Sequence, residues 1–172
     1  RPSKYLKDAA AEDIHSAFKG FKHRFTTGDD VSCLLIGMKY LIQRYGSIEK
    51  CFMAGLRYDD DNIIDALSNF ERQLACKVCL NLIPVPGRKS ACKRLHLFLR
   101  WMVRKDEGDP GGGDKVPPSK LIVPLDTHMH RIGRELGFTR RKQANLTAAM
   151  EITEAFKTME PDDPVKYDFV LT

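Results

Sequence analysis

The sequence lacks the features that mark membrane and secreted proteins. No apolar run reaches the ~20 residues that a membrane-spanning helix needs, and no charged-then-apolar leader indicates export. The five cysteines are odd in number and irregularly spaced, which argues against a disulfide framework and favours a reducing compartment. The sequence therefore predicts a cytoplasmic protein with no membrane partner.

Metal-ligand patterns are equally sparse. Cys76 and Cys79 form a single Cys-x-x-Cys, whereas a zinc or iron–sulfur site needs about four ligands. Two small apolar residues on a buried helix face are the favoured interpretation. The run 59–61 of three aspartates lacks the alternating ligands and the glycine of a calcium loop. We therefore expect no metal and no cofactor.

Helical periodicity dominates what is present, and no convincing alternating strand occurs. The 172 residues suffice for one domain with a sizeable core. We expect an all-α fold of roughly seven or eight helices, forming one monomeric domain over residues 1–172. A loop over 105–120 carries four Gly and three Pro. The expected helices are 13–21, one capped by Asp29 or Asp30 and ended by Gly46, 47–54, 63–82, 88–104, one capped by Asp126 and ended by Gly137, one from Thr139 to Met159, and one opened by Asp163 and Pro164.

Cations gather in one of these expected helices. From Arg88 to Lys105 the chain carries seven Lys or Arg and no acid. A helical wheel places two sets on separate faces: Ala91, Leu95, Phe98 and Met102 toward the core, and Lys89, Lys93, His96, Arg100 and Arg104 on the other. Because like charges one turn apart repel, two interpretations stay open. The face meets an anion such as phosphate, or it is solvated and partly neutralised by acids from other helices.

Lys89 differs from the other cations because it falls in the expected first turn of this helix. The partly positive helix N-terminus, Arg88 and Lys93 all oppose its charge. A lysine treated in this way can act as an amine nucleophile, although most lysines in first turns have no such role.

Two segments resemble the helix-hairpin-helix DNA glycosylase superfamily, which includes endonuclease III and the 8-oxoguanine glycosylases. "IPVPGRKSA" is similar to the hairpin Leu-Pro-Gly-x-Gly-(Arg/Thr)-Lys-x-Ala, and "VPLDTHMHRIGRELG" to the Pro-Val-Asp-Thr-His segment that follows it. The resemblance covers about residues 63–137, and the whole chain also looks like a bacterial family of uncharacterised relatives. It implies a glycosylase-like helical fold, although the N-terminal helices usual in these enzymes find no match in residues 1–30.

The resemblance further implies base excision from double-stranded DNA, with an oxidised base such as 8-oxoguanine as the target. Lys89 falls on the catalytic lysine, which forms a Schiff base with the sugar and gives the enzyme its lyase activity. Asp126 falls on the catalytic aspartate, with Thr127 and His128 in support. The residues expected to contact DNA are Gly87, Arg88, Lys93, Arg94 and Arg131.

The hairpin departs from the family pattern at two positions. Val85 stands where the first glycine is usual, and Pro86 has no N–H to offer a phosphate. These departures motivate an alternative, in which the chain is a non-catalytic DNA-binding protein that keeps the glycosylase scaffold. A third hypothesis is an all-α interaction protein with a solvated basic face.

Overall fold

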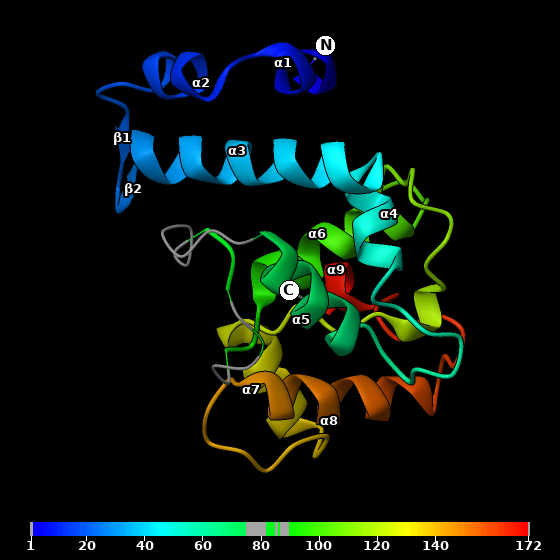
Figure 1. The fold of residues 1–172 in the computed structure, drawn as a ribbon. Helices are drawn as coiled ribbons and strands as arrows, with labels where there is room; N and C mark the ends of the chain where they lie inside the picture. Colours follow the sequence, from blue (N-terminus) through cyan, green and yellow to red (C-terminus); the bar gives the residue numbers. More distant parts are fainter. Residues whose placement is uncertain (1, 75–81, 85, 87–89, 172) are drawn as a thin grey trace. The chain divides into compact units, whose positions relative to one another are not determined.

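The computed structural model describes residues 2–74, 82–84, 86 and 90–171. These residues are mostly helical, as predicted, with one two-stranded antiparallel sheet that was not predicted (Figure 1). The chain divides into two compact units: unit 1 comprises Arg1–Gly55 and Ala66–Pro84, and unit 2 comprises Leu56–Asp65 and Val85–Thr172. The single domain expected from the chain length stays a prediction. Among the described residues, no helix has both the length and the apolarity to cross a membrane.

Unit 1 is built around its longest helix, α3, with α1 and α2 packed along it (Figure 1). Thr27 caps α3 through a reciprocal pair: its hydroxyl accepts from the Asp30 N–H, and the Asp30 carboxylate accepts from the Thr27 N–H. The cap therefore lies two residues before the predicted Asp29, while the predicted end at Gly46 is confirmed by its φ of 83°. The elements are α1 Pro2–Asp8, α2 Ala11–Ala17, β1 Lys22–His23, β2 Thr26–Thr27, α3 Gly28–Tyr45, α4 Ile48–Met53 and most of α5 Ile64–Leu74.

The core of unit 1 joins residues from α2, α3, α4 and α5. Ile14 and Leu41 are fully buried, and the rings of Phe52 and Phe70 meet edge to face with centroids 6.5 Å apart. Burial of each such side chain stabilises the fold by about 1.5–3 kcal/mol. Cys33 takes part in a disulfide, which the irregular cysteine spacing did not predict.

Unit 2 is organised by α6, α7 and α8. The predicted cap Asp126 is confirmed, because its carboxylate accepts from the Met129 N–H at the start of α7. The predicted cap Thr139 is wrong: Asn145 caps α8, and the Thr139 hydroxyl instead donates to Glu151. The elements are α6 Lys93–Val103, the 3-10 helix η3 Pro118–Lys120, α7 Thr127–Glu135, α8 Leu146–Lys157 and α9 Asp168–Leu171.

Helix α6 contradicts two predictions. It begins at Lys93 and not at Arg88, behind Cys92, whose φ of 49° is left-handed. Its buried face is also the one predicted to be cationic: His96 and Arg100 are 1% and 3% exposed, whereas Phe98, expected in the core, is 51% exposed. Helical periodicity therefore gave the wrong inward face.

The reason for this inversion is a buried network of ion pairs. Arg100 Nε lies 3.1 Å from Asp109 Oδ2, and its Nη1 lies 2.5 Å from Asp168 Oδ2. Arg104 contacts the same Asp109 carboxylate, and also pairs with Asp106 and Asp163, each at 2.8 Å. Acids from the glycine- and proline-rich loop and from the C-terminal segment thus neutralise the cations of α6. Of the two interpretations of the cationic face, neutralisation by acids holds for Arg100 and Arg104.

Loss of Arg100 is expected to unfold unit 2 far more readily than loss of an exposed arginine. Arg100→Met leaves buried aspartates without their partner, which costs about 3–5 kcal/mol. Arg131→Met is the matched control, because Arg131 makes only an exposed 3.9 Å pair with Glu135 and should cost at most about 1 kcal/mol. Urea unfolding followed by circular dichroism measures both, and equal free energies of unfolding for the two variants would contradict the buried network.

Candidate functional site

Asp126 is the anchor of the candidate site. It is the N-cap of α7 in extended backbone conformation, and its Oδ1 accepts from the Met129 N–H at 2.8 Å. A short polar side chain at this position satisfies a donor that the helix leaves unpaired. The side chain is 22% exposed, so the carboxylate is held in place and still reaches solvent.

A lysine amine lies directly against this carboxylate. The Nζ of Lys93, the first residue of α6, is 3.1 Å from Asp126 Oδ2, and the lysine side chain is 47% exposed. The first residue of α6 therefore meets the N-cap of α7. Lys93 was predicted to hold phosphate, whereas the structure places it on the predicted catalytic aspartate. The predicted residues Lys89, Arg88 and Gly87 lie outside the described residues.

The surroundings keep Asp126 ionised at neutral pH. Partial burial acts to raise the pKa of its carboxyl group, but the N–H of Met129, the Lys93 amine and the N–H of His128 together lower the pKa below its ordinary value. An amine and a carboxylate within hydrogen-bond distance, accessible to solvent, are the groups that Schiff-base chemistry at a sugar needs.

Two buried side chains behind this pair were missed in the sequence. Burial raises the pKa of Asp168, the Arg100 guanidinium works against that rise, and the charges of Asp126 and Lys93 also act on it in opposite directions. Asp168 therefore couples the pair electrostatically to the buried network of α6. His96, one turn after Lys93, has a pKa lowered to about 4 by burial, and neither of its ring nitrogens has a hydrogen-bond partner within the described part of the chain.

The other predicted site residues are exposed. Thr127 and His128 lie in the first turn of α7, and Arg94 lies in the first turn of α6. Arg131 is on α7, where its guanidinium lies 3.9 Å from Glu135. Among the predicted site residues that the structure describes, Asp126 and Lys93 are the pair that a direct hydrogen bond brings together.

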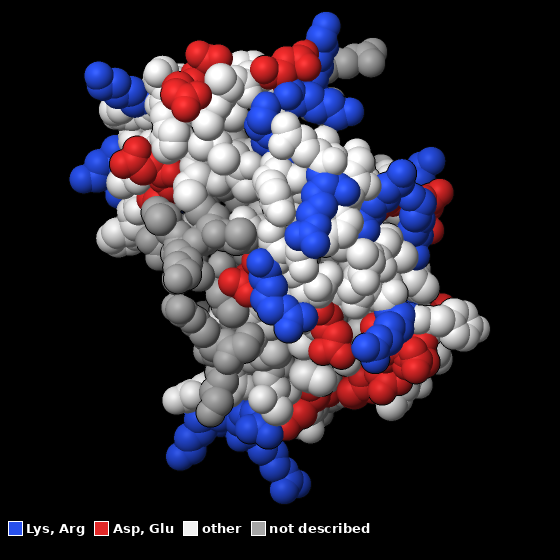
Figure 2. All heavy atoms as spheres, viewed as in Figure 1, with Lys and Arg blue, Asp and Glu red and all other residues white. Residues whose placement is uncertain are grey.

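A group of exposed cations follows along α7 and the loop after it. We call it the α7–α8 basic patch, and Figure 2 shows Lys and Arg side chains gathered at the lower left, where Figure 1 draws this loop. Ser90 pairs with Asn145 at the end of the loop, which brings the segment after the predicted hairpin beside it. Sequence analysis named only one of its five residues, although the run "RRK" was the available signal. The patch consists of Arg131, Arg134, Arg140, Arg141 and Lys142.

Within the described residues, no three His, Cys, Asp or Glu side chains are grouped as a metal ion would need. Cys76 and Cys79 lie outside the described residues. The expectation that the protein uses no metal and no cofactor stays a prediction.

Comparison with known families assigns the chain to one of them. The chain belongs to the family described as Protein of unknown function (DUF2400), whose model matches residues 1–172. Comparisons with curated proteins and with solved structures gave no match. The expected membership of the helix-hairpin-helix DNA glycosylase superfamily is therefore wrong, because the matching family is DUF2400 and no glycosylase family matched. The two short segments that suggested it do not define the family of the chain.

Substitutions at Asp126 should separate its cap from its charge. Asn caps helices as well as Asp does, whereas Ala does not, so Asp126→Ala should lower the free energy of unfolding by about 1 kcal/mol more than Asp126→Asn. The pKa of Asp126 is lowered on folding, so its charge stabilises the fold above the ordinary pKa of 3.8 and loses this effect as the pH falls through the lowered folded value. The wild type should therefore approach Asp126→Asn in stability below about pH 3.8. Unfolding curves measured across this range that stay parallel would contradict the lowered pKa.

Proposed function

We propose that this protein acts on double-stranded DNA as a glycosylase with lyase activity, removing an oxidised base such as 8-oxoguanine through a lysine Schiff base. The observation that carries the proposal is the contact between the Lys93 amine and the Asp126 carboxylate, 3.1 Å apart and open to solvent. The proposal depends on these two groups and on the cations around them, and does not depend on membership of a known glycosylase family.

The proposed chemistry assigns one task to each group. The lysine amine attacks C1′ of the sugar, the damaged base leaves, and the sugar ring opens to an imine with the lysine. Asp126 stabilises the positive charge that develops at C1′, and a fixed carboxylate in such a site contributes several kcal/mol. Its ionised state, supported by the α7 N-terminus, suits this role. The target nucleotide must leave the duplex stack to reach the pair.

The α7–α8 basic patch supplies the contacts to DNA phosphates. Arg134, Arg140 and Lys142 are exposed, and side chains of this kind position a duplex through its backbone and carry no sequence information. Arg141 is partly neutralised by Glu151, 2.8 Å away. Arg131 extends the patch along α7 in the direction of Asp126.

Borohydride trapping tests the proposed reaction. The full chain is mixed with labelled duplexes that carry either 8-oxoguanine or an abasic site, and borohydride reduces the imine to a stable covalent complex. We expect the wild type to form this complex, Lys93→Gln to form none, and Asp126→Asn to form it about 10²–10³-fold more slowly. Lys105→Gln, an exposed lysine beyond the far end of α6, is the control and should react as the wild type does.

Lys89→Gln is assayed in parallel because the sequence predicts Lys89 as the nucleophile. Loss of the complex in Lys89→Gln alone would assign the reaction to Lys89 and remove Lys93 from the nucleophile's role. No complex from the wild type, or an undiminished one when both lysines are replaced together, would contradict the reaction itself.

One observation favours a second candidate, a non-catalytic DNA-binding protein. Each oxygen of Asp126 already accepts a hydrogen bond, Oδ1 from the Met129 N–H and Oδ2 from Lys93. A carboxylate engaged in this way is also what a purely structural cap would show. In this case the cations near the pair serve only to hold DNA.

The second candidate predicts binding without lesion preference. Lys93→Ala and Arg94→Ala should each weaken duplex binding evenly across sequences and reduce the slope of log affinity against log salt by about 0.9 for each phosphate that the side chain neutralises. Fluorescence anisotropy over a salt series measures this slope. A tighter complex with 8-oxoguanine duplex than with undamaged duplex would exclude the second candidate.

A further inference from the structure

Unit 1 carries a short hairpin in which aromatic and cationic side chains alternate. We call residues 18–27 the hairpin finger; it contains β1, β2 and the turn between them. The finger holds three phenylalanines, three cations and His23, and it holds no acid. Neither the candidate site nor the proposed function uses any of these residues.

The finger is fixed firmly to the start of α3. The Gly28 N–H donates to the Phe21 carbonyl at 2.8 Å, and the Phe21 N–H donates to the Phe18 carbonyl at 3.0 Å. A Cβ at Gly28 would lie 2.0 Å from the Phe18 carbonyl oxygen, so only glycine allows this close approach. The strands pair Lys22 with Thr27. The finger is therefore a braced structure that presents its side chains in a defined arrangement.

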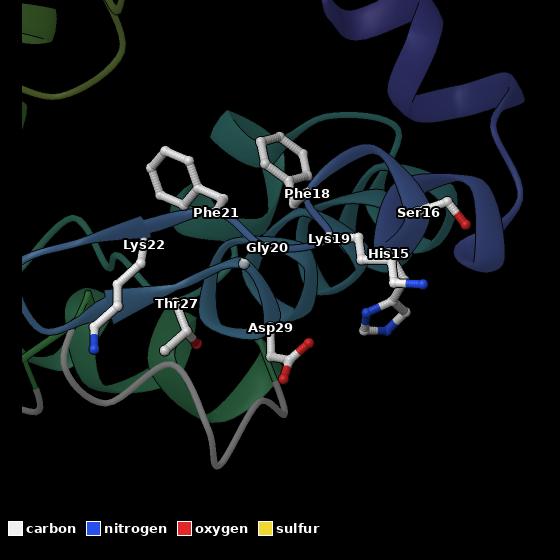
Figure 3. A pocket seen from close by; sticks show the side chains of 10 residues that line it. His15, Ser16, Phe18, Lys19, Gly20, Phe21, Lys22, Thr27 and Asp29 are labelled. Carbon is white, nitrogen blue, oxygen red and sulfur yellow. The ribbon is translucent and has the colours of Figure 1, made fainter.

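A hollow of about 570 Å³ lies at the base of the finger. Figure 3 shows the rings of Phe18 and Phe21 on one side of the Gly20 backbone and the side chains of Thr27 and Asp29 on the other. The two rings meet edge to face, with centroids 6.3 Å apart. The size of the hollow is typical of sites that bind small molecules or single residues of a polymer, and it combines ring faces with polar groups.

The aromatic rings of the finger are open to solvent. Phe25, in the turn between the strands, is 89% exposed, and Phe21 is 45% exposed. Lys19, Lys22 and Arg24 are exposed between them in the chain. Single exposed aromatics are common on proteins, but rings interleaved with cations along one braced segment match what bases and phosphates require. Bases stack on the rings, and the phosphates between bases meet the cations.

We propose that the hairpin finger and its hollow bind a single-stranded segment of nucleic acid. Bases stack on Phe21 and Phe25, the phosphates pair with Lys19, Lys22 and Arg24, and the polar groups of the hollow face the edge of a base. A single strand is the occupant because intact duplex keeps its bases stacked on one another, away from aromatic side chains. An acidic peptide would satisfy the cations but offers no regular series of ring faces. This surface is separate from Asp126, and its binding needs no covalent chemistry.

Fluorescence anisotropy of the full chain with a labelled oligothymidylate tests the proposal. Phe25→Ala should weaken binding about tenfold or more, as loss of one base–aromatic stack does. Replacing Lys19, Lys22 and Arg24 together with Ala should reduce the salt slope by about 2, from about 0.7 for each single-strand phosphate. Phe25→Trp should bind at least as well as the wild type. Tyr58→Ala, which removes a fully exposed ring from unit 2, is the control and should leave affinity unchanged.

Photocross-linking with a bromodeoxyuridine oligonucleotide, followed by mass spectrometry, locates the contact independently. Cross-links to Phe21 or Phe25 support the proposal. It is overturned by the absence of oligothymidylate binding at low salt, by equal affinities of Phe25→Ala and Tyr58→Ala, or by cross-links confined to unit 2. Thermal unfolding of Phe25→Ala should match the wild type, because so exposed a ring contributes little to the core.

The finger and the proposed lyase site are separated by crossing their assays. Phe25→Ala should still form the borohydride complex with an abasic duplex, and Lys93→Gln should still bind oligothymidylate. Oligothymidylate binding with no borohydride complex supports the finger alone. A borohydride complex with no oligothymidylate binding overturns the finger and leaves the lyase proposal standing.

Discussion

The position of α6 depends on the ion pairs that hold Arg100 and Arg104 among Asp106, Asp109, Asp163 and Asp168. Burial of so many charges is favourable only when each is paired and hydrogen-bonded, because desolvation costs several kcal/mol for each ion. The pairing sets which face of α6 turns inward and connects the helix to both the long loop and the C-terminal segment. It also sets where α6 begins to approach α7, and therefore where Lys93 lies relative to Asp126.

The sequence predicted what is encoded locally. Gly46, Ser47 and Asp126 were assigned as helix ends because a cap needs only its own side chain or backbone freedom and the next three residues, and all three are confirmed. The inward face of α6 was predicted wrongly for the opposite reason. Arg100 meets Asp109 and Asp168, 9 and 68 positions away, and periodicity holds no information about such partners. Thr139 failed as a cap because Asn145, closer to the helix, serves instead.

The candidate site was predicted in part. Asp126 was named, but its described partner is Lys93, which had been assigned to phosphate, and Lys89 lies outside the described residues. Asp168 and the run 140–142 were missed, because the first acts through a distant contact and the second lies in a loop between expected helices. Two short matching segments also suggested a superfamily to which the chain does not belong, since it belongs to DUF2400 over its whole length. Short segments that resemble a family carry residue types, whereas membership requires a match along the chain.

The central claim is that the amine beside Asp126 reacts with DNA. The most direct measurement is the identity of the lysine that borohydride fixes to an abasic-site sugar, determined by peptide mass spectrometry of the wild-type complex. We expect the modified residue to be Lys93, in contact with Asp126. Modification of a lysine remote from Asp126, such as Lys120 or Lys157, or the absence of any modified lysine, would contradict the claim.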